Sequence, residues 1–164
     1  MDACKTLVQA LVISRLDYGS SLLYGSNKGH LKKLQHLQNS AARLICRKTV
    51  REDARPLTQT LHWLLVDYWI QFCIATHVYR CLHDKSPVYL SELLHETCSM
   101  RNLRSNSQHN HEVKRTNSKA GGNAFDICGP RLWNSLPENI RTATNSDKFK
   151  KLLKTAYFKA AYDV

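Results

Sequence analysis

The sequence lacks the paired acidic residues that metal-dependent nucleotidyl transfer requires. Its 13 Asp and Glu residues are scattered along 164 residues, and no Asp-Asp or Asp-x-Asp pair is present to hold Mg²⁺. The chain also contains no G-x-x-x-x-G-K-[ST], G-x-G-x-x-G or G-x-S-x-G motif. We therefore predict that the protein is not an enzyme and uses no cofactor, and we assign no catalytic residue.

Closely spaced cysteine pairs and long hydrophobic runs are absent as well. The six cysteines include no C-x-x-C pair, and no signal peptide precedes them. This usage predicts reduced thiols in an intracellular protein, nuclear or cytoplasmic. The most apolar stretch, residues 7–23, is interrupted by Gln9, Arg15 and Asp17, so we expect no transmembrane span and no membrane partner.

Negative charge is scarce compared with positive charge. The chain has 24 Lys and Arg, which gives a formal net charge of +11, and no acidic residue occurs between Tyr18 and Arg51. Such an excess predicts a polyanionic partner or an anionic surface. A basic protein without such a partner is the alternative.

Hydrophobic periodicity predicts a mainly α fold with about five helices. The predicted helices cover residues 3–24, 28–47, 66–85, 86–94 and 145–162. In the first, the predicted inward face consists of Leu7, Leu11, Ser14, Tyr18 and Leu22. Pro56 is expected to break helical continuity between the second and third helices.

The predicted helix at 28–47 combines an apolar and a cationic face. The apolar face consists of Leu31, Leu34, Leu37, Ala41, Leu44 and Ile45. At about 100° per residue, the opposite face gathers Lys32, His36, Asn39, Arg43 and Arg47. A helix of this kind can pack and bind anions at once, although a merely solvated surface gives the same pattern.

The segment between the helices is polar. The polar, poorly periodic composition of residues 97–124 predicts a basic loop. A small irregular or β-containing insert is expected near 105–135. The chain therefore divides into a helical segment at 1–96, the loop at 97–124, and a last segment at 125–164.

A metal site and an aromatic stacking surface are weighed against core packing. Cys73, His77 and Cys81 are spaced i, i+4, i+8, but the outer two lie roughly 12 Å apart along a helix and fall in an apolar stripe. His109 and His111 have no cysteine at suitable spacing. We favour core packing and assign no metal site. The three tryptophans and the tyrosines could stack on bases, but apolar neighbours favour core positions for Trp69 and Trp133.

Several stretches together resemble the tail of a non-LTR retrotransposon (LINE) reverse transcriptase of the jockey-like group. In order, they are QALVISRLDYGSSLLYG, LKKLQHLQNSAARLI, LHWLLVDYWIQFCIATHVYRCLHDKSPVYLSELL, RNLRS, AFDICGPRLWNSLPENIR and FKKLLKT. The resemblance runs from about Asp2 to Phe158. The chain departs from the pattern at Gly19, where the family often has Cys, at Leu65, where Pro is usual, and at Trp69, which replaces a basic residue.

The resemblance implies a position after the polymerase palm, in the region that follows the thumb. The catalytic residues of that family belong to upstream segments, so none is carried over. Met1 directly precedes family-like sequence, which predicts a chain without its upstream reverse-transcriptase domain, a possible partner. The PRLWNSLP stretch is typical of this position, and its residues predict a structural lock rather than a site. The predicted lock consists of Pro130, Leu132, Trp133, Asn134 and Pro137.

The sequence therefore predicts a non-catalytic, nucleic-acid-binding fragment that contacts RNA or DNA phosphates without sequence choice. The predicted contacts in and after the second helix are Lys32, Lys33, Arg43, Arg47, Lys48 and Arg51. The predicted contacts in the loop are Arg101, Arg104, Lys114, Arg115 and Lys119. The alternative is a translated retroelement fragment with no activity.

Overall fold

The computed structural model describes residues 2–95, 110–118 and 121–163. Within these ranges the chain forms helices and almost no strand, and five helices have seven residues or more. The mainly α prediction is confirmed. The chain divides into two compact units, which cut across the three segments expected from the sequence. Unit 1 comprises residues up to Ile70 and from Lys154 onward, and unit 2 runs from Gln71 to Leu153.

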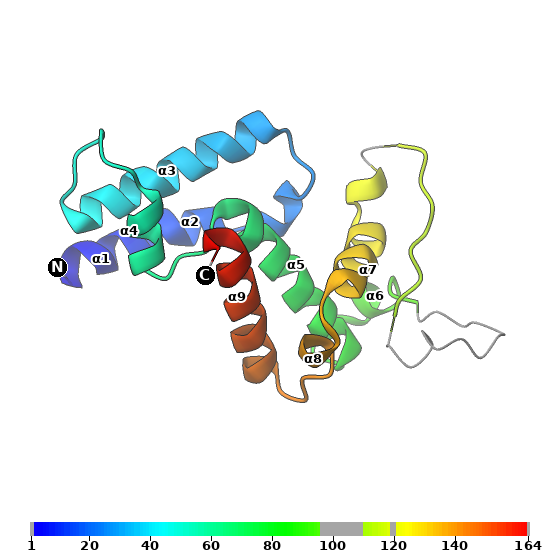
Figure 1. Ribbon diagram of the computed structural model, residues 1–164. Coiled ribbons are helices and arrows are strands. Elements are labelled where there is room, and N and C mark those ends of the chain that lie inside the picture. The colour runs from blue at the N-terminus through cyan, green and yellow to red at the C-terminus, as the bar shows by residue number, and fades with distance from the viewer. Residues whose placement is uncertain (1, 96–109, 119–120, 164) are drawn as a thin grey trace. The chain divides into compact units, whose positions relative to one another are not determined.

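The helical elements are shown in Figure 1, and two of them, α5 and α9, contribute to both units. In chain order, the first elements are α1 (Asp2–Val8), the π-helical η1 (Gln9–Ile13), α2 (Ser14–Asp17), the 3-10 turn η2 (Ser20–Leu23), α3 (Lys28–Cys46), α4 (Arg55–Thr60) and α5 (Val66–Leu82). The later elements are α6 (Val88–Ser91), η4 (Gly121–Asn123), α7 (Phe125–Ser135), α8 (Glu138–Arg141) and α9 (Ser146–Tyr162).

The first helical stretch of unit 1 ends earlier than predicted. It runs through α1, η1 and α2 and stops at Asp17, because Tyr18 is extended and Gly19 takes a left-handed conformation with φ 67°. A residue with a Cβ is disfavoured at this φ, so Gly19 allows the chain to turn into η2.

The predicted inward face of this stretch was wrong. Its members Leu7, Leu11, Tyr18 and Leu22 are 60%, 67%, 90% and 86% exposed, and Ser14 is exposed too. The buried contact is made instead by Val8, with Cys4, Val12 and Ile13 packed around it. The π-helical turn contributes to the error, because it shifts the residues after it out of the regular α-helical spacing.

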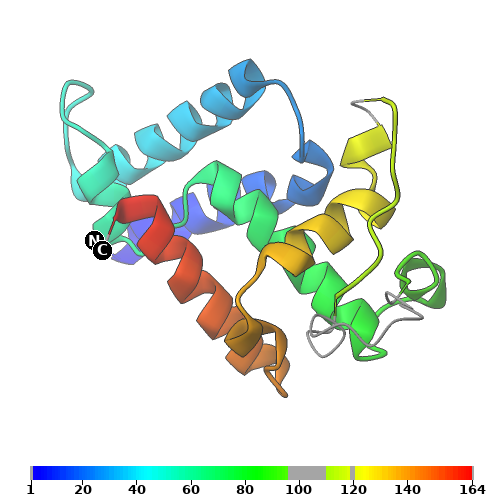
Figure 2. The same cartoon turned by 45° about the vertical axis from the view of Figure 1, so that its right-hand side comes forward.

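Helix α3 lies beside α1 in both views (Figures 1 and 2), and its packing face is rotated from the predicted one. Ala41 and Ile45 are buried against Val8, as the apolar pattern predicts. Leu37 and Leu44 are exposed, however, and the buried positions include Gln38 and Ala42. The helix begins where the Asn27 side chain accepts a bond of 2.9 Å from the Gly29 amide.

The remaining elements of unit 1 fasten the end of α9 to the chain around α4. Pro56 lies in the first turn of α4, where its missing N–H is harmless, so it starts a short helix rather than only ending one. The Tyr162 hydroxyl donates to the Trp63 carbonyl at 2.8 Å, and Arg55 donates to the Ala161 carbonyl at 2.8 Å.

The core of unit 2 is built around an aromatic stack. Phe149 of α9 lies 4.3 Å from the Tyr79 ring of α5 and 5.8 Å from the Trp133 ring of α7, centroid to centroid. Gly129 permits the close approach of α7 to α5, because a Cβ there would lie 3.1 Å from Val78. The buried positions of α5 and α9 recur at helical intervals, with Ile74 and Val78 four residues apart and Phe149 and Leu153 four residues apart.

The PRLWNSLP stretch is mostly helical, which corrects the expected irregular or β-containing insert over its last part. Pro130 lies inside α7 and is buried, although it has no N–H for a helical hydrogen bond. Leu132 and Trp133 are buried as expected, and their burial offsets that loss. Pro137 directly precedes α8.

Asn134, a member of the predicted lock, binds a segment that is distant in sequence. Its amide nitrogen donates to the His111 carbonyl at 2.8 Å, and its oxygen accepts from the His111 amide at 2.9 Å. One side chain thus satisfies both backbone polar groups of His111, the position of an isolated β-bridge. The rest of the described chain from 110 to 118 has neither helix nor strand.

Candidate nucleic-acid interface

One side of α3 carries a row of basic side chains, which we call the α3 basic face. It consists of Lys28, Lys32, Arg43 and Arg47, with Lys33 beside it and Lys48 and Arg51 following in the loop. At 100° per residue the first four fall within a sector of roughly 100°. All except Arg43 are exposed. Lys28 was missed by the sequence analysis, although its position one helical turn before Lys32 was the available signal.

Two of the predicted phosphate contacts are already engaged. Arg43 is half-buried, and its Nε donates to the Glu52 carbonyl at 3.0 Å, so it holds the loop after α3. Lys48 pairs with the Glu52 carboxylate at 3.0 Å. The hydrogen bond from Lys48, followed by that from the Thr49 amide, lowers the pKa of Glu52. The sequence analysis missed this ion pair, because the stretch before Arg51 contains no acidic residue and Glu52 follows directly after it.

The other members of the face have no acidic partner in the part of the chain that the structure describes. No ion pair joins a described acidic residue to Lys28, Lys32, Lys33, Arg47 or Arg51. These five side chains are therefore the ones whose charge is available to an anion.

A groove of about 820 Å³ runs along the same side of α3 within unit 1. Lys28, Lys32 and Asn39 line one part of it, whereas Asp53 and Asp67 line another. Arg55 also lines it, but this side chain is held by the end of α9 and pairs with Asp163 at 3.5 Å. The carboxylates of Asp53 and Asp67 make the groove unfavourable for phosphate. The exposed basic side chains of α3 are therefore the better surface for an anion.

The predicted loop contacts are only partly covered by the structure. Arg101, Arg104 and Lys119 lie outside the described residues. Lys114 and Arg115 are exposed, and Lys114 lies 3.4 Å from the Asp126 carboxylate. Both belong to unit 2, and α3 belongs to unit 1.

The residues weighed as metal ligands have packing roles. In the described ranges, no group of three or more His, Cys, Asp or Glu residues lies close enough together to hold a metal ion. Cys81 is buried, and burial lowers the pKa of His77, with the charge of Arg80 adding to the effect. His111 is also buried, with its ring against the edge of Trp133. His109 lies outside the described residues.

The tryptophans do not form an exposed stacking surface. Trp133 is buried, whereas Trp63 and Trp69 are half-buried. Among the described residues, the exposed aromatic side chains are instead Tyr18, which was expected on the packing face of the first helix, and Tyr89.

Comparisons with known proteins give no relative: no family model, no curated protein and no solved structure matches the chain. Among the described residues, every helix is too short or too polar to cross a bilayer.

Proposed function

We propose that this protein is a non-catalytic nucleic-acid-binding module that contacts phosphates through the α3 basic face. The observation that carries the proposal is the row of exposed basic side chains without acidic partners among the described residues. The resemblance to the region that follows the thumb of a LINE reverse transcriptase supports it, since such a region would lie beside template RNA or target DNA. The retroelement origin itself is part of the proposal.

The dimensions of the face suit a polynucleotide. Lys28 and Arg47 are 19 residues apart, which corresponds to roughly 28 Å along a helix at 1.5 Å per residue. This is a little less than one turn of duplex DNA, about 34 Å. A rod-shaped polyanion can therefore contact several of these side chains at once.

The chemistry of the face favours binding without sequence choice. The ammonium groups of Lys28 and Lys32 carry charge but no acceptor, so they suit phosphate oxygens and do not distinguish bases. Arg47 and Arg51 can contact phosphate through two parallel hydrogen bonds. We therefore expect similar affinity for unrelated sequences.

The test compares two triple variants that lose the same charge. Lys28→Gln, Lys32→Gln and Arg47→Gln together remove the proposed contacts, whereas Lys148→Gln, Lys151→Gln and Lys159→Gln remove three exposed lysines of α9. Glutamine has a helix propensity close to that of lysine and arginine, so both variants should fold. Affinity is measured by fluorescence anisotropy of labelled RNA and DNA of two unrelated sequences.

We expect the α3 variant to lose at least about tenfold in affinity, since each phosphate contact at low salt contributes through counterion release. The α9 variant should lose clearly less. Equal losses in both variants would mean that only the net charge matters, which contradicts the proposed interface.

A retroelement-derived fragment with no activity is the second candidate. The exposed leucines Leu7, Leu11 and Leu22 favour it, because proteins seldom leave so many large apolar side chains in water. It predicts no measurable binding of either nucleic acid by the folded chain at low salt.

A further inference from the structure

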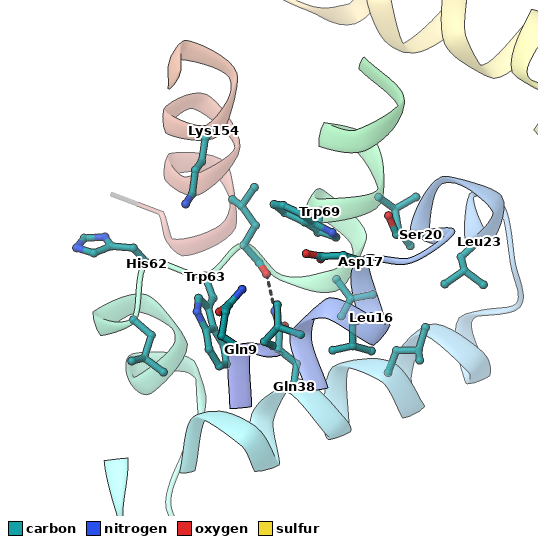
Figure 3. A pocket seen from close by; sticks show the side chains of 16 residues that line it. Gln9, Leu16, Asp17, Ser20, Leu23, Gln38, His62, Trp63, Trp69 and Lys154 are labelled. Atoms are coloured by element: carbon teal, nitrogen blue, oxygen red, sulfur yellow. Dashed lines mark hydrogen bonds between the residues drawn. The ribbon is translucent and has the colours of Figure 1, made fainter. Parts of the chain in front are cut away.

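A pocket of about 260 Å³ lies within unit 1, away from the residues assigned to phosphate binding. Figure 3 shows it from close by. Its walls are mainly apolar, with Ile13, Leu16 and Leu34 on one part and the rings of Trp63 and Trp69 on another. An apolar cavity of roughly 150 Å³ already accommodates benzene. The pocket is therefore large enough for a small molecule with one or two rings.

Among the described residues, Asp17 is the only acidic one that lines the pocket. It is the last residue of α2, and its carboxylate and the indole nitrogen of Trp69 point toward each other (Figure 3). Burial raises the pKa of Asp17, and a hydrogen bond from the Trp69 side chain partly offsets that rise. The carboxylate thus forms no ion pair with a described basic residue and is only partly compensated.

The other polar groups of the pocket do not supply a counterion for Asp17. The Gln38 amide nitrogen already donates to the Leu64 carbonyl at 2.9 Å. Lys154 lines the pocket from α9, but its side chain is exposed and no ion pair joins it to Asp17. His62 is exposed too and stacks on Phe158 at 5.7 Å.

We propose that this pocket binds a small organic cation, an amine with a flat apolar body, whose ammonium group pairs with Asp17 beside the Trp69 ring (Figure 3). The Asp17 carboxylate can neutralise an ammonium group through a charge-assisted hydrogen bond, and the indole rings of the pocket can pack against the flat body of the ligand. The apolar walls exclude water from the body of the ligand. The site is separate from the α3 basic face and does not depend on the proposed nucleic-acid binding.

The test uses three probes that share one ring system and differ in charge: tryptamine, 3-methylindole and indole-3-propionate. Binding to the full chain is followed by NMR chemical-shift changes. We expect tryptamine to bind about tenfold more tightly than the neutral and anionic probes, since only its ammonium group can pair with the Asp17 carboxylate beside the apolar walls.

Two substitutions should change tryptamine binding in opposite directions. Asp17→Asn should reduce tryptamine affinity to the level of 3-methylindole and leave 3-methylindole unaffected. Lys154→Gln should increase tryptamine affinity, because it removes the one lysine or arginine charge found among the described residues that line the pocket. Asp67→Asn, an exposed acid outside this pocket, is the matched control and should have no effect.

Equal affinities for the three probes, tightest binding of the anion, or no binding of any probe would each overturn the proposal. Circular dichroism establishes that Asp17→Asn is folded. Should that variant be unfolded, the probe series on the parent chain and the Lys154→Gln shift still decide the matter. The separate anisotropy titration with RNA distinguishes failure here from failure of the proposed function.

Discussion

Trp133 is 2% exposed and lies between Phe149 and His111 in the core of unit 2. Trp133→Ala should therefore lower the free energy of unfolding by about 3–5 kcal/mol, the usual cost of removing a large buried aromatic side chain. Denaturant unfolding followed by circular dichroism measures this change. Arg131→Ala, at an exposed position of the same helix, should change stability by no more than about 0.5 kcal/mol.

The Trp133→Ala variant also distinguishes a packing role for this side chain from a role in stacking on bases. Trp133→Ala should leave nucleic-acid affinity unchanged in the molecules that remain folded. A variant that unfolds like the parent but binds RNA much more weakly would show that Trp133 stacks on bases.

Asp17 gives a prediction about pH. Burial raises its pKa in the folded state, so the charged form is penalised there relative to the unfolded chain. The folded state therefore loses stability as pH rises through the ordinary value of 3.8, and the loss disappears at lower pH, where both states are protonated. Asp17→Asn should raise the urea midpoint at pH 7, and the difference from the parent should shrink toward pH 3.

Asp67 provides the opposite control. It lies in the first turn of α5, where a negative charge favours the helix dipole, so Asp67→Asn should lower the midpoint at pH 7. A midpoint for Asp17→Asn that stays below the parent value at neutral pH would show that the carboxylate stabilises the fold.

Residues were predictable where local spacing decides their environment. The burial of Leu132, Trp133, Phe149 and Leu153 follows from apolar neighbours at helical intervals. The pairing of Glu52 with Lys48 and the position of Asp17 beside Trp69 were not predictable. They depend on contacts that a turn or a distant helix creates.

At the scale of the element, α3 is held in register by glutamine side chains. Gln38 is buried and donates to Leu64, while Gln35 accepts from the Val66 amide at 2.9 Å. Gln38→Leu should cost about 1–3 kcal/mol, because the Leu64 carbonyl stays buried without its donor. Thermal unfolding measures the loss.

His30→Leu is the matched change at an exposed position of α3 outside the basic face and should have little effect on stability. Neither substitution should alter RNA affinity per folded molecule. If Gln38→Leu is as stable as the parent, the bond to Leu64 does not fix this helix.

Element positions were predicted better than element faces. The range of α3 and the start of α9 agree with the sequence to within one residue. The faces of the first helix and α3 were wrong in part, since the π-helical turn and the buried polar Gln38 depart from a simple apolar stripe. Helix α7 was not predicted, because it contains Pro130 and a proline in a helix interior is normally unfavourable.

At the scale of the whole molecule, the two predicted sets of phosphate contacts belong to different units. The α3 basic face lies in unit 1, whereas Lys114 and Arg115 lie in unit 2. The composition predicts a polyanionic partner, but it cannot show which basic side chains form ion pairs with acidic residues in the folded chain. The structure reduces the candidate set of unit 1 to the exposed members of the face.

The salt dependence of nucleic-acid binding tests whether the α3 basic face contacts phosphates. The logarithm of the association constant is plotted against the logarithm of the salt concentration for a labelled duplex, with the parent chain, the α3 triple variant and the α9 triple variant. The account predicts a linear fall, with a slope that becomes shallower by about two to three units in the α3 variant, since each lost duplex phosphate contact removes about 0.9. The slope of the α9 variant should match the parent. An unchanged slope in the α3 variant would contradict the account and leave α3 as a solvated surface.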